Sequence, residues 1–423
     1  MRLLSRTALV AAILSVAACT ASGPEGETSS VSEVRIGVLA PESGASRAAG
    51  AEAVRGAELA AALINGEEGS VPLAGAGTAG LAGLGGAKLS IVRGDTRSTS
   101  EVGATEAARL VTEEQVAGLV GAYDPLVTEV ASQRTERLGV PFVNGDSPAG
   151  HLTERGLDWF FRTGPTDRMF GEAFFSALGE IAGADASKVA VLYSDDRPSS
   201  VVANLTEELA EEGGFELAPK VAFDPDAGNP VAAVAQIRDQ PEQPDAVFVI
   251  ASTTEDAAKL LKAFGQANYS PSGILVAGAG FGPSTVLGAG PDGEALLSGT
   301  AWSREIAGRS AIAKPVMDRY EERFNQPMSE TAAGTFTAVL VLAEAIDNAG
   351  STDPQRVRAA LLNLDIPGRE MIMPWSGLRF DASHQNVAAN GVVEQRVDQV
   401  FRVVYPGELQ QAEPVWPRPG AGS

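Results

Sequence analysis

Cysteine and histidine are nearly absent from this chain. Its 423 residues include one cysteine, Cys19, and two histidines, His151 and His384. No disulfide can form within a chain that has a single thiol, and a structural zinc site built from several thiolates is excluded as well. The two histidines lie far apart in the sequence, which argues against a catalytic zinc site. The sequence therefore implies no metal and no cofactor.

Positive charge and long apolar runs are also scarce. The chain carries 32 Lys and Arg residues against 54 Asp and Glu residues, a net charge of −22. Nucleic acids and anionic lipid surfaces attract basic proteins, so we predict no nucleic-acid partner. The most apolar internal segment, Ala332–Ile346, contains Thr335, Thr337 and Glu344. These polar residues favour a buried helix over a membrane span.

The N-terminus has the pattern of a secretory signal peptide. Arg2 and Arg6 precede an apolar run, Ala8–Ala18, which ends in small residues directly before Cys19. This ending resembles the lipobox at which bacterial lipoprotein signal peptides are cut. We therefore expect residues 1–18 to be removed and the Cys19 thiol to carry a diacylglyceryl group, whose two chains suffice for stable anchoring.

This anchoring predicts where the protein lies. Residues 19–33 are small and polar, as in a flexible tether. We expect a protein held by lipid at the outer face of the cytoplasmic membrane, on its periplasmic side. An ordinary signal cleavage beside an unmodified cysteine is the alternative.

From Val34 onward, short apolar strands alternate with helical patterns, which predicts parallel sheets covered by helices on both faces. A chain of this length usually forms two lobes. The expected strands are 34–40, 88–93, 117–121, 140–143, 188–193, 216–223, 246–250 and 273–277, with strand character again at 378–404. The expected helices are 48–65, 101–114, 125–138, 199–212, 229–240, 255–266, 309–325, 329–349 and 354–363.

Two segments have little regular pattern. Residues 66–87 are rich in Gly and Ala, but they have neither a Walker lysine nor a strand directly upstream. They predict a flexible insertion loop and not a phosphate-binding loop. Residues 406–423 are rich in Pro and Gly, which predicts a disordered tail.

Five segments resemble the branched-chain amino-acid-type solute-binding proteins, which are class I periplasmic binding proteins of ABC transporters. The segments are IGVLAPESGASRAAGAEAVRGAELAAALIN (36–65), VRGDTRSTSEVGATEAARLVTEEQVAGLVGAY (92–123), LGVPFVNGDSPAGHLTERGLDWFFRTGPTD (138–167), FTAVLVLAEAIDNAG (336–350) and MPWSGLRFDASHQN (373–386). The resemblance implies two doubly wound parallel-sheet α/β lobes, joined by a three-strand hinge, that close on a ligand. Lobe one would comprise 34–162 plus 303–385, and lobe two 163–302 plus 386–405.

The resemblance also implies a function. The protein would be a monomeric solute-binding lipoprotein, not an enzyme, that captures a small polar ligand such as an amino acid or amide. It would deliver this ligand to the permease of an ABC importer. The contacts carried over by position are Ser43 at the rim and, in the cleft, Tyr123, Asp124, Asp146, Ser147, Thr253 and Phe281.

This chain departs from those relatives at the cleft. Where they present a serine to a ligand carboxylate, it has Asp124 followed by Pro125, which also suits a plain helix cap. Asp146 likewise suits an Asx-turn before Ser-Pro. A carboxylate ligand would be repelled by such acids. The acidic residues of the cleft loops therefore favour a neutral polar or cationic ligand: Asp124, Asp146, Asp195 and Asp196.

Two other functions are compatible with parts of the sequence. Ser147, in Gly-Asp-Ser after a strand, together with Asp381 and His384, matches the spacing of SGNH-type esterases. The chain lacks the block that would supply their oxyanion hole. A regulatory lipoprotein of cell-wall synthesis would use the same two-lobed fold through protein contacts.

Overall fold

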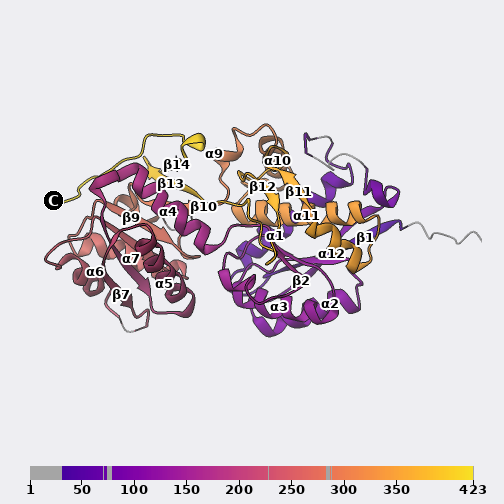
Figure 1. The fold of residues 1–423 in the computed structure, drawn as a ribbon, viewed down its shortest axis with the longest axis horizontal. Coiled ribbons are helices and arrows are strands. Elements are labelled where there is room, and N and C mark those ends of the chain that lie inside the picture. The colour runs from indigo at the N-terminus through magenta and orange to yellow at the C-terminus, as the bar shows by residue number, and fades with distance from the viewer. Residues whose placement is uncertain are drawn as a thin grey trace, which may run out of the picture.

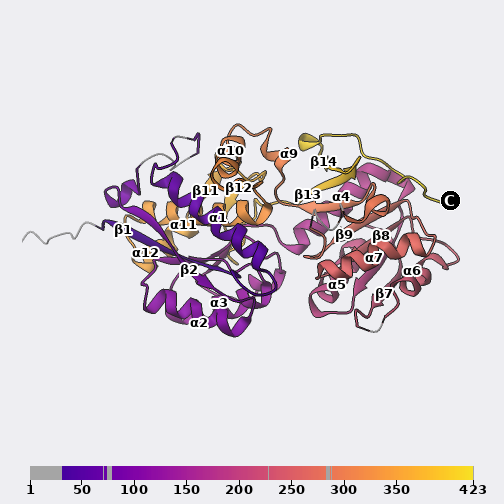
Figure 2. The same cartoon turned by 180° about the vertical axis from the view of Figure 1, so that it is seen from behind.

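The structure, a computed structural model, describes residues 31–69, 71–73, 79–226, 228–282, 286 and 288–422. Two α/β lobes lie side by side (Figures 1 and 2), each built on its own sheet. The predicted fold class is therefore confirmed. The predicted signal peptide and Cys19 lie outside the described residues.

Lobe one contains a five-stranded sheet in the order β2-β1-β3-β4-β5, in which all neighbouring pairs are parallel. Helices α1 and α11 cover one face and α2 and α3 the other. The strands are β1 (Glu33–Ala40), β2 (Lys88–Asp95), β3 (Gly118–Val120), β4 (Phe142–Asn144) and β5 (Phe160–Arg162), beside a two-stranded sheet of β11 (Asp365–Pro367) and β12 (Gly377–Arg379). The helices are α1 (Arg47–Ile64), α2 (Ser100–Thr112), α3 (Pro125–Leu138), α10 (Ala313–Phe324), α11 (Glu330–Ala349) and α12 (Pro354–Leu362).

Lobe two contains a seven-stranded sheet in the order β14-β13-β10-β9-β8-β6-β7. Its strands are parallel from β7 to β10, and β13 and β14 extend it as antiparallel strands. The strands are β6 (Lys188–Ser194), β7 (Glu216–Phe223), β8 (Ala246–Ile250), β9 (Gly273–Ala277), β10 (Leu297–Thr300), β13 (Val392–Val397) and β14 (Val400–Tyr405). The helices are α4 (Asp167–Ala182), α5 (Arg197–Glu212), α6 (Pro230–Arg238) and α7 (Thr254–Gln266), and α9 (Arg304–Ala307) lies at the junction of the lobes.

The chain passes between the two sheets three times: after β5, after β10 and before β13. The first and third crossovers are joined by hydrogen bonds, since Asn386 donates its backbone N–H to the Arg162 carbonyl (2.9 Å) and its side chain to the Thr163 carbonyl (3.0 Å). The fully buried Arg162 guanidinium donates to Gln385 Oε1 (2.6 Å) and to the Ala149 carbonyl (2.5 Å). These bonds hold the first and third crossovers together at their lobe-one ends, where the hinge begins.

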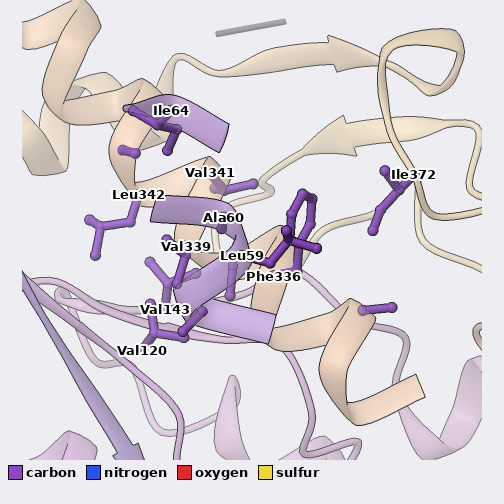
Figure 3. Packing of buried hydrophobic residues seen from close by; sticks show 14 of the residues in the cluster. Leu59, Ala60, Ile64, Val120, Val143, Phe336, Val339, Val341, Leu342 and Ile372 are labelled. Atoms are coloured by element: carbon purple, nitrogen blue, oxygen red, sulfur yellow. The ribbon is translucent and has the colours of Figure 1, made fainter. Parts of the chain in front are cut away.

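The core of lobe one lies between α1 and α11. Figure 3 shows Leu59 and Ala60 of α1 close to Phe336 and Val339 of α11, all of them buried. Among the described residues, α11 alone is long and apolar enough to cross a membrane, and 72% of its most apolar 18-residue stretch is buried inside the protein. The prediction of a buried helix in this segment is therefore confirmed.

The prediction of a disordered C-terminal tail needs correction. Residues 406–422 do not form a disordered tail: they run along lobe two, where the Arg418 backbone N–H donates to the Ser272 carbonyl (2.9 Å) and Trp416 packs on the core. In the insertion 66–87, the backbone N–H of Gly83 donates to Asp347 Oδ1 (2.7 Å). The Pro- and Gly-rich composition of residues 406–422 indicates little regular structure, but tertiary hydrogen bonds fix their path along lobe two.

Candidate functional site

The carboxyl ends of both parallel sheets face the junction between the lobes. In lobe one, β5 ends at Arg162 and leads directly into the first crossover. In lobe two, β10 runs parallel to β9 and ends at Thr300, where the second crossover begins. Each lobe therefore lies beyond the carboxyl edge of the other lobe's sheet, which is where ligands bind in open parallel sheets. The loops after β1, β3, β4, β6, β8 and β9 follow the carboxyl ends of these strands, at the two edges that face the junction.

The loop after β3 carries Tyr123 and Asp124. Asp124 is the N-cap of α3: its Oδ1 accepts the backbone N–H of Leu126 (2.8 Å) and of Val127 (3.2 Å). Its carboxylate is thus used by the helix, as the capping interpretation predicts. Tyr123 has a backbone φ of 71°, a left-handed conformation that is uncommon for a non-glycine residue. Burial raises the pKa of its phenol, and the negative charge of Asp146 raises it further.

The loop after β4 carries Asp146 and Ser147. Asp146 Oδ2 accepts a hydrogen bond from the Thr335 hydroxyl of α11 (3.1 Å). Burial raises the pKa of Asp146 to about 7, against the effect of this hydrogen bond, which lowers it. Ser147 is 1% exposed, and its hydroxyl has no hydrogen-bond partner in the described part of the chain. Asp146 is partly exposed, whereas the prediction that Ser147 contacts a ligand needs correction, because its side chain is buried.

Ser43 lies at the edge of lobe one, in the loop after β1. Its hydroxyl donates to Asp95 Oδ2 (2.6 Å) and its backbone N–H to Asp95 Oδ1 (3.1 Å). Asp95 is the last residue of β2, and its pKa is lowered below the usual value by these bonds together with the Arg97 backbone N–H, against burial, which raises it. Ser43 is exposed, so a rim position fits the structure.

In lobe two, the loops after β6, β8 and β9 lie against one another. Ser252 donates to Asp196 Oδ2 (2.8 Å), and Asp196 also caps α5. Thr253 is exposed and caps α7, with its hydroxyl 2.6 Å from Asp256 Oδ2. Phe281 is only 6% exposed, and it packs inside the apolar core of lobe two. Phe281 is thus a core side chain in this structure, and the prediction that it faces the cleft needs correction, because the apolar ring is more stable in the core.

Two acidic residues of lobe one that the sequence did not indicate also lie near Tyr123. Glu52 of α1 accepts from the hydroxyl of Ser329 (2.8 Å), and Glu330 Oε2 lies 2.7 Å from the Thr300 hydroxyl. The carboxylates of both residues raise the pKa of Tyr123, so they share its surroundings. Glu330 directly follows the N-cap of α11, which is the only sequence signal for its position. Glu52 has none.

The three residues of the esterase hypothesis do not form a catalytic relay. The Ser147 hydroxyl has no hydrogen-bond partner among the described residues. His384 Nδ1 lies 3.1 Å from the Phe160 carbonyl, and its ring stacks on Phe161 at 4.4 Å. Asp381 accepts from Ser383 and Gln385 instead of orienting the imidazole. A nucleophile, base and orienting acid must be hydrogen-bonded in series, and here they are not.

Comparison with known proteins places this architecture in a family. A sequence model described as periplasmic binding protein matches residues 33–397. The Leu/Ile/Val-binding protein homolog 7 of Brucella abortus is 27% identical over 403 residues, covering 93% of this chain and 95% of that protein.

Solved structures agree on the fold. A putative branched-chain amino acid ABC transporter protein from Silicibacter pomeroyi has a TM-score of 0.77 at 19% identity and covers 92% of this chain and 100% of its own. The isoleucine complex of the substrate-binding protein LivJ from Streptococcus pneumoniae has a TM-score of 0.69 at 24% identity and covers 88% and 100%. A benzoate complex of a solute-binding protein from R. palustris has a TM-score of 0.68 at 17% identity and covers 88% and 95%. The chain therefore belongs to the periplasmic binding protein family.

Proposed function

We propose that this protein captures a small polar ligand between its lobes and delivers it to the permease of an ABC importer. The observation that carries the proposal is the position of the carboxyl ends of both parallel sheets, which face one junction spanned by three short crossovers. Such crossovers allow hinge closure, and closure buries a ligand between the two edges. The chemistry required is binding and release alone.

Acidic residues near Tyr123 in lobe one favour a ligand without a free carboxylate. Tyr123 and Asp146 lie there, with Glu52 and Glu330 close to the phenol. A ligand carboxylate about 4 Å from one ionised acid would be disfavoured by about 4 kcal/mol at an effective dielectric constant of 20. The related structures hold isoleucine and benzoate, and both of these ligands carry a carboxylate. A neutral polar or cationic ligand, an amide or an amine, would distinguish this chain from them, and its support is the acidic residues around Tyr123.

The proposed contacts are Tyr123 and Asp146 from lobe one, Thr253 from lobe two, and Ser43 at the rim. Asp124 acts indirectly: its carboxylate accepts the first backbone N–H groups of α3 and so holds the loop that carries Tyr123. We further propose that residues 1–18 are cleaved, that Cys19 carries the lipid, and that the monomer works from the outer face of the cytoplasmic membrane.

A thermal-shift screen of residues 31–423 tests ligand capture. The library contains amino acids, amino-acid amides, polyamines, small sugars and short carboxylic acids. A ligand at 100 times its Kd adds about 2.7 kcal/mol, which should raise the Tm by about 5–10 °C. We expect amides or amines to give this shift and free carboxylic acids to give none. Hits confined to acids would refute the proposed ligand class.

A pull-down from detergent-solubilised membranes tests delivery. Recovery of an ABC permease would support transport. Recovery of a cell-wall synthase without any permease, together with a flat screen, would contradict it in favour of a regulatory lipoprotein.

A further inference from the structure

The short helix α9 contacts both lobes at the hinge. It directly follows the second crossover and lies at the junction in Figure 1. Ile306 packs with Val392 and Val403, which belong to β13 and β14 of lobe two. The next residue, Ala307, belongs to the apolar core of lobe one. Any change in the angle between the lobes must therefore change how α9 packs on one of them.

A buried carboxyl group lies beneath this helix. Glu394 is on β13, opposite Ser298 of β10 and Val403 of β14. Its side chain is 6% exposed, and Oε1 has no hydrogen-bond partner in the described part of the chain. The carboxyl is hydrogen-bonded by Ser303, the N-cap of α9. An ionised carboxylate with a buried, unpaired oxygen is costly, whereas a protonated one is not.

The charged groups that shift the pKa of Glu394 are also acidic. They are Glu305 of α9 and Glu330 at the start of α11 in lobe one. Burial raises the pKa of Glu394 to about 7, the Ser303 hydrogen bond lowers it, and Glu305 and Glu330 raise it. The repulsion therefore acts between a carboxylate of lobe two and carboxylates on the lobe-one side of the crossover.

The basic residues of the neighbouring elements are engaged elsewhere. Arg396, two residues along β13, directs Nη1 to the Gly290 carbonyl (2.6 Å). Arg304 of α9 pairs with Glu321 of α10 (2.9 Å). Arg402 of β14 is paired with Gln395, so it lies on the other face of the sheet from Glu394. None of these three cations neutralises the buried carboxyl group.

We propose that the contact of α9 with β13 and β14 is a proton-linked latch on the hinge. Glu394 holds a proton while α9 is packed on the sheet of lobe two. When that proton is lost, the buried negative charge is repelled by Glu305, and by Glu330 once that residue, whose pKa is itself raised by burial, has ionised. The carboxylate then gains by reaching water. The α9 contact then weakens, and the lobes adopt a different mean separation. The latch acts in the ligand-free protein, so it does not depend on which solute the protein binds.

The sign of the pH dependence follows from linkage. A folded-state pKa of about 7, above the ordinary glutamate value of 4.5, means that the packed form holds the extra proton between these two pH values. The latch is therefore at full strength below about pH 4.5, weakens as the pH rises, and stops changing above about pH 8. One proton limits the loss to about tenfold in the packing equilibrium per pH unit.

Hydrogen exchange and small-angle X-ray scattering of the ligand-free protein test this latch between pH 5.5 and 8.5. We compare wild type with Glu394→Gln, which keeps the shape of the side chain and removes its charge. The matched control is Glu180→Gln, at an exposed position of α4. After correction for intrinsic exchange, protection of residues 301–312 should fall with rising pH in wild type and in the control. The radius of gyration should change over the same pH range, and both profiles should be flat in Glu394→Gln.

Identical pH profiles in Glu394→Gln and wild type would overturn the proposal. A change in α9 protection at a constant radius of gyration would also overturn it, because the proton would then not act on the hinge. If Glu394→Gln does not fold, Ser303→Ala replaces it. The lost hydrogen bond should move the midpoint of the transition to higher pH, and an unmoved midpoint would refute the assignment to Glu394.

Discussion

Asp146 is the residue at which the local surroundings most clearly set the chemistry of the cleft. Its sequence context, Gly-Asp-Ser-Pro, suits an Asx-turn and indicates nothing about charge. Burial in the tertiary structure raises its pKa to about 7, while Thr335, almost 190 residues later in the chain, supplies the hydrogen bond. Its charge therefore changes within the physiological pH range.

This titration predicts the pH dependence of ligand affinity. A cationic ligand found in the screen should bind about tenfold more tightly at pH 8 than at pH 6, because Asp146 is mostly ionised at the higher pH. Asp146→Asn should remove this dependence, and Glu180→Gln should keep it. Isothermal titration calorimetry at the two pH values measures both effects. An equal pH dependence in Asp146→Asn would show that Asp146 does not contact the ligand.

At the scale of elements, the packing of α1 on α11 depends on one glycine. A Cβ atom at Gly56 would clash with the carbonyl oxygen of Ala332. The two helices can therefore approach closely only while position 56 has no side chain. By contrast, a Cβ at Gly179 of α4 would meet nothing.

These two helical glycines should respond oppositely to the same substitution. Gly56→Ala should lower the free energy of unfolding by about 1–3 kcal/mol, because the helices must move apart. Gly179→Ala should raise it by about 0.5–1 kcal/mol through helix propensity. Urea denaturation of both variants measures the difference. Stabilisation by Gly56→Ala would show that the close contact is absent.

At the scale of the whole molecule, the net charge of −22 acts against compactness. Raising NaCl from 10 to 300 mM shortens the Debye length severalfold and screens this repulsion. We expect a gain of about 1 kcal/mol, or about 2–4 °C in Tm. Differential scanning calorimetry in NaCl and KCl at equal ionic strength should give the same gain. A Tm that stays constant or falls would mean that the surface charges are already balanced by local ion pairs.

The sequence predicts most of the alternation of strands and helices, but it misses the 16-residue helix α4 and several short strands. β5, β10 and β11 have three or four residues each, too few for a periodic pattern to be seen. β5 and β10 end where the chain leaves a sheet for a crossover, so their pairing depends on long-range partners. At the site, the sequence places Asp124 correctly as a helix cap, since Asp-Pro is a local signal.

What the sequence determines by itself is what local chemistry and composition decide: the α/β class, the absence of a disulfide, the acidic surface and the helix caps. What only the tertiary structure decides depends on residues far apart in the chain. Phe281 belongs to the core, Glu330 belongs beside Tyr123, and Glu394 lies beneath α9. Burial and electrostatic interactions follow distance in space, and hinge crossovers bring together residues that no local pattern connects.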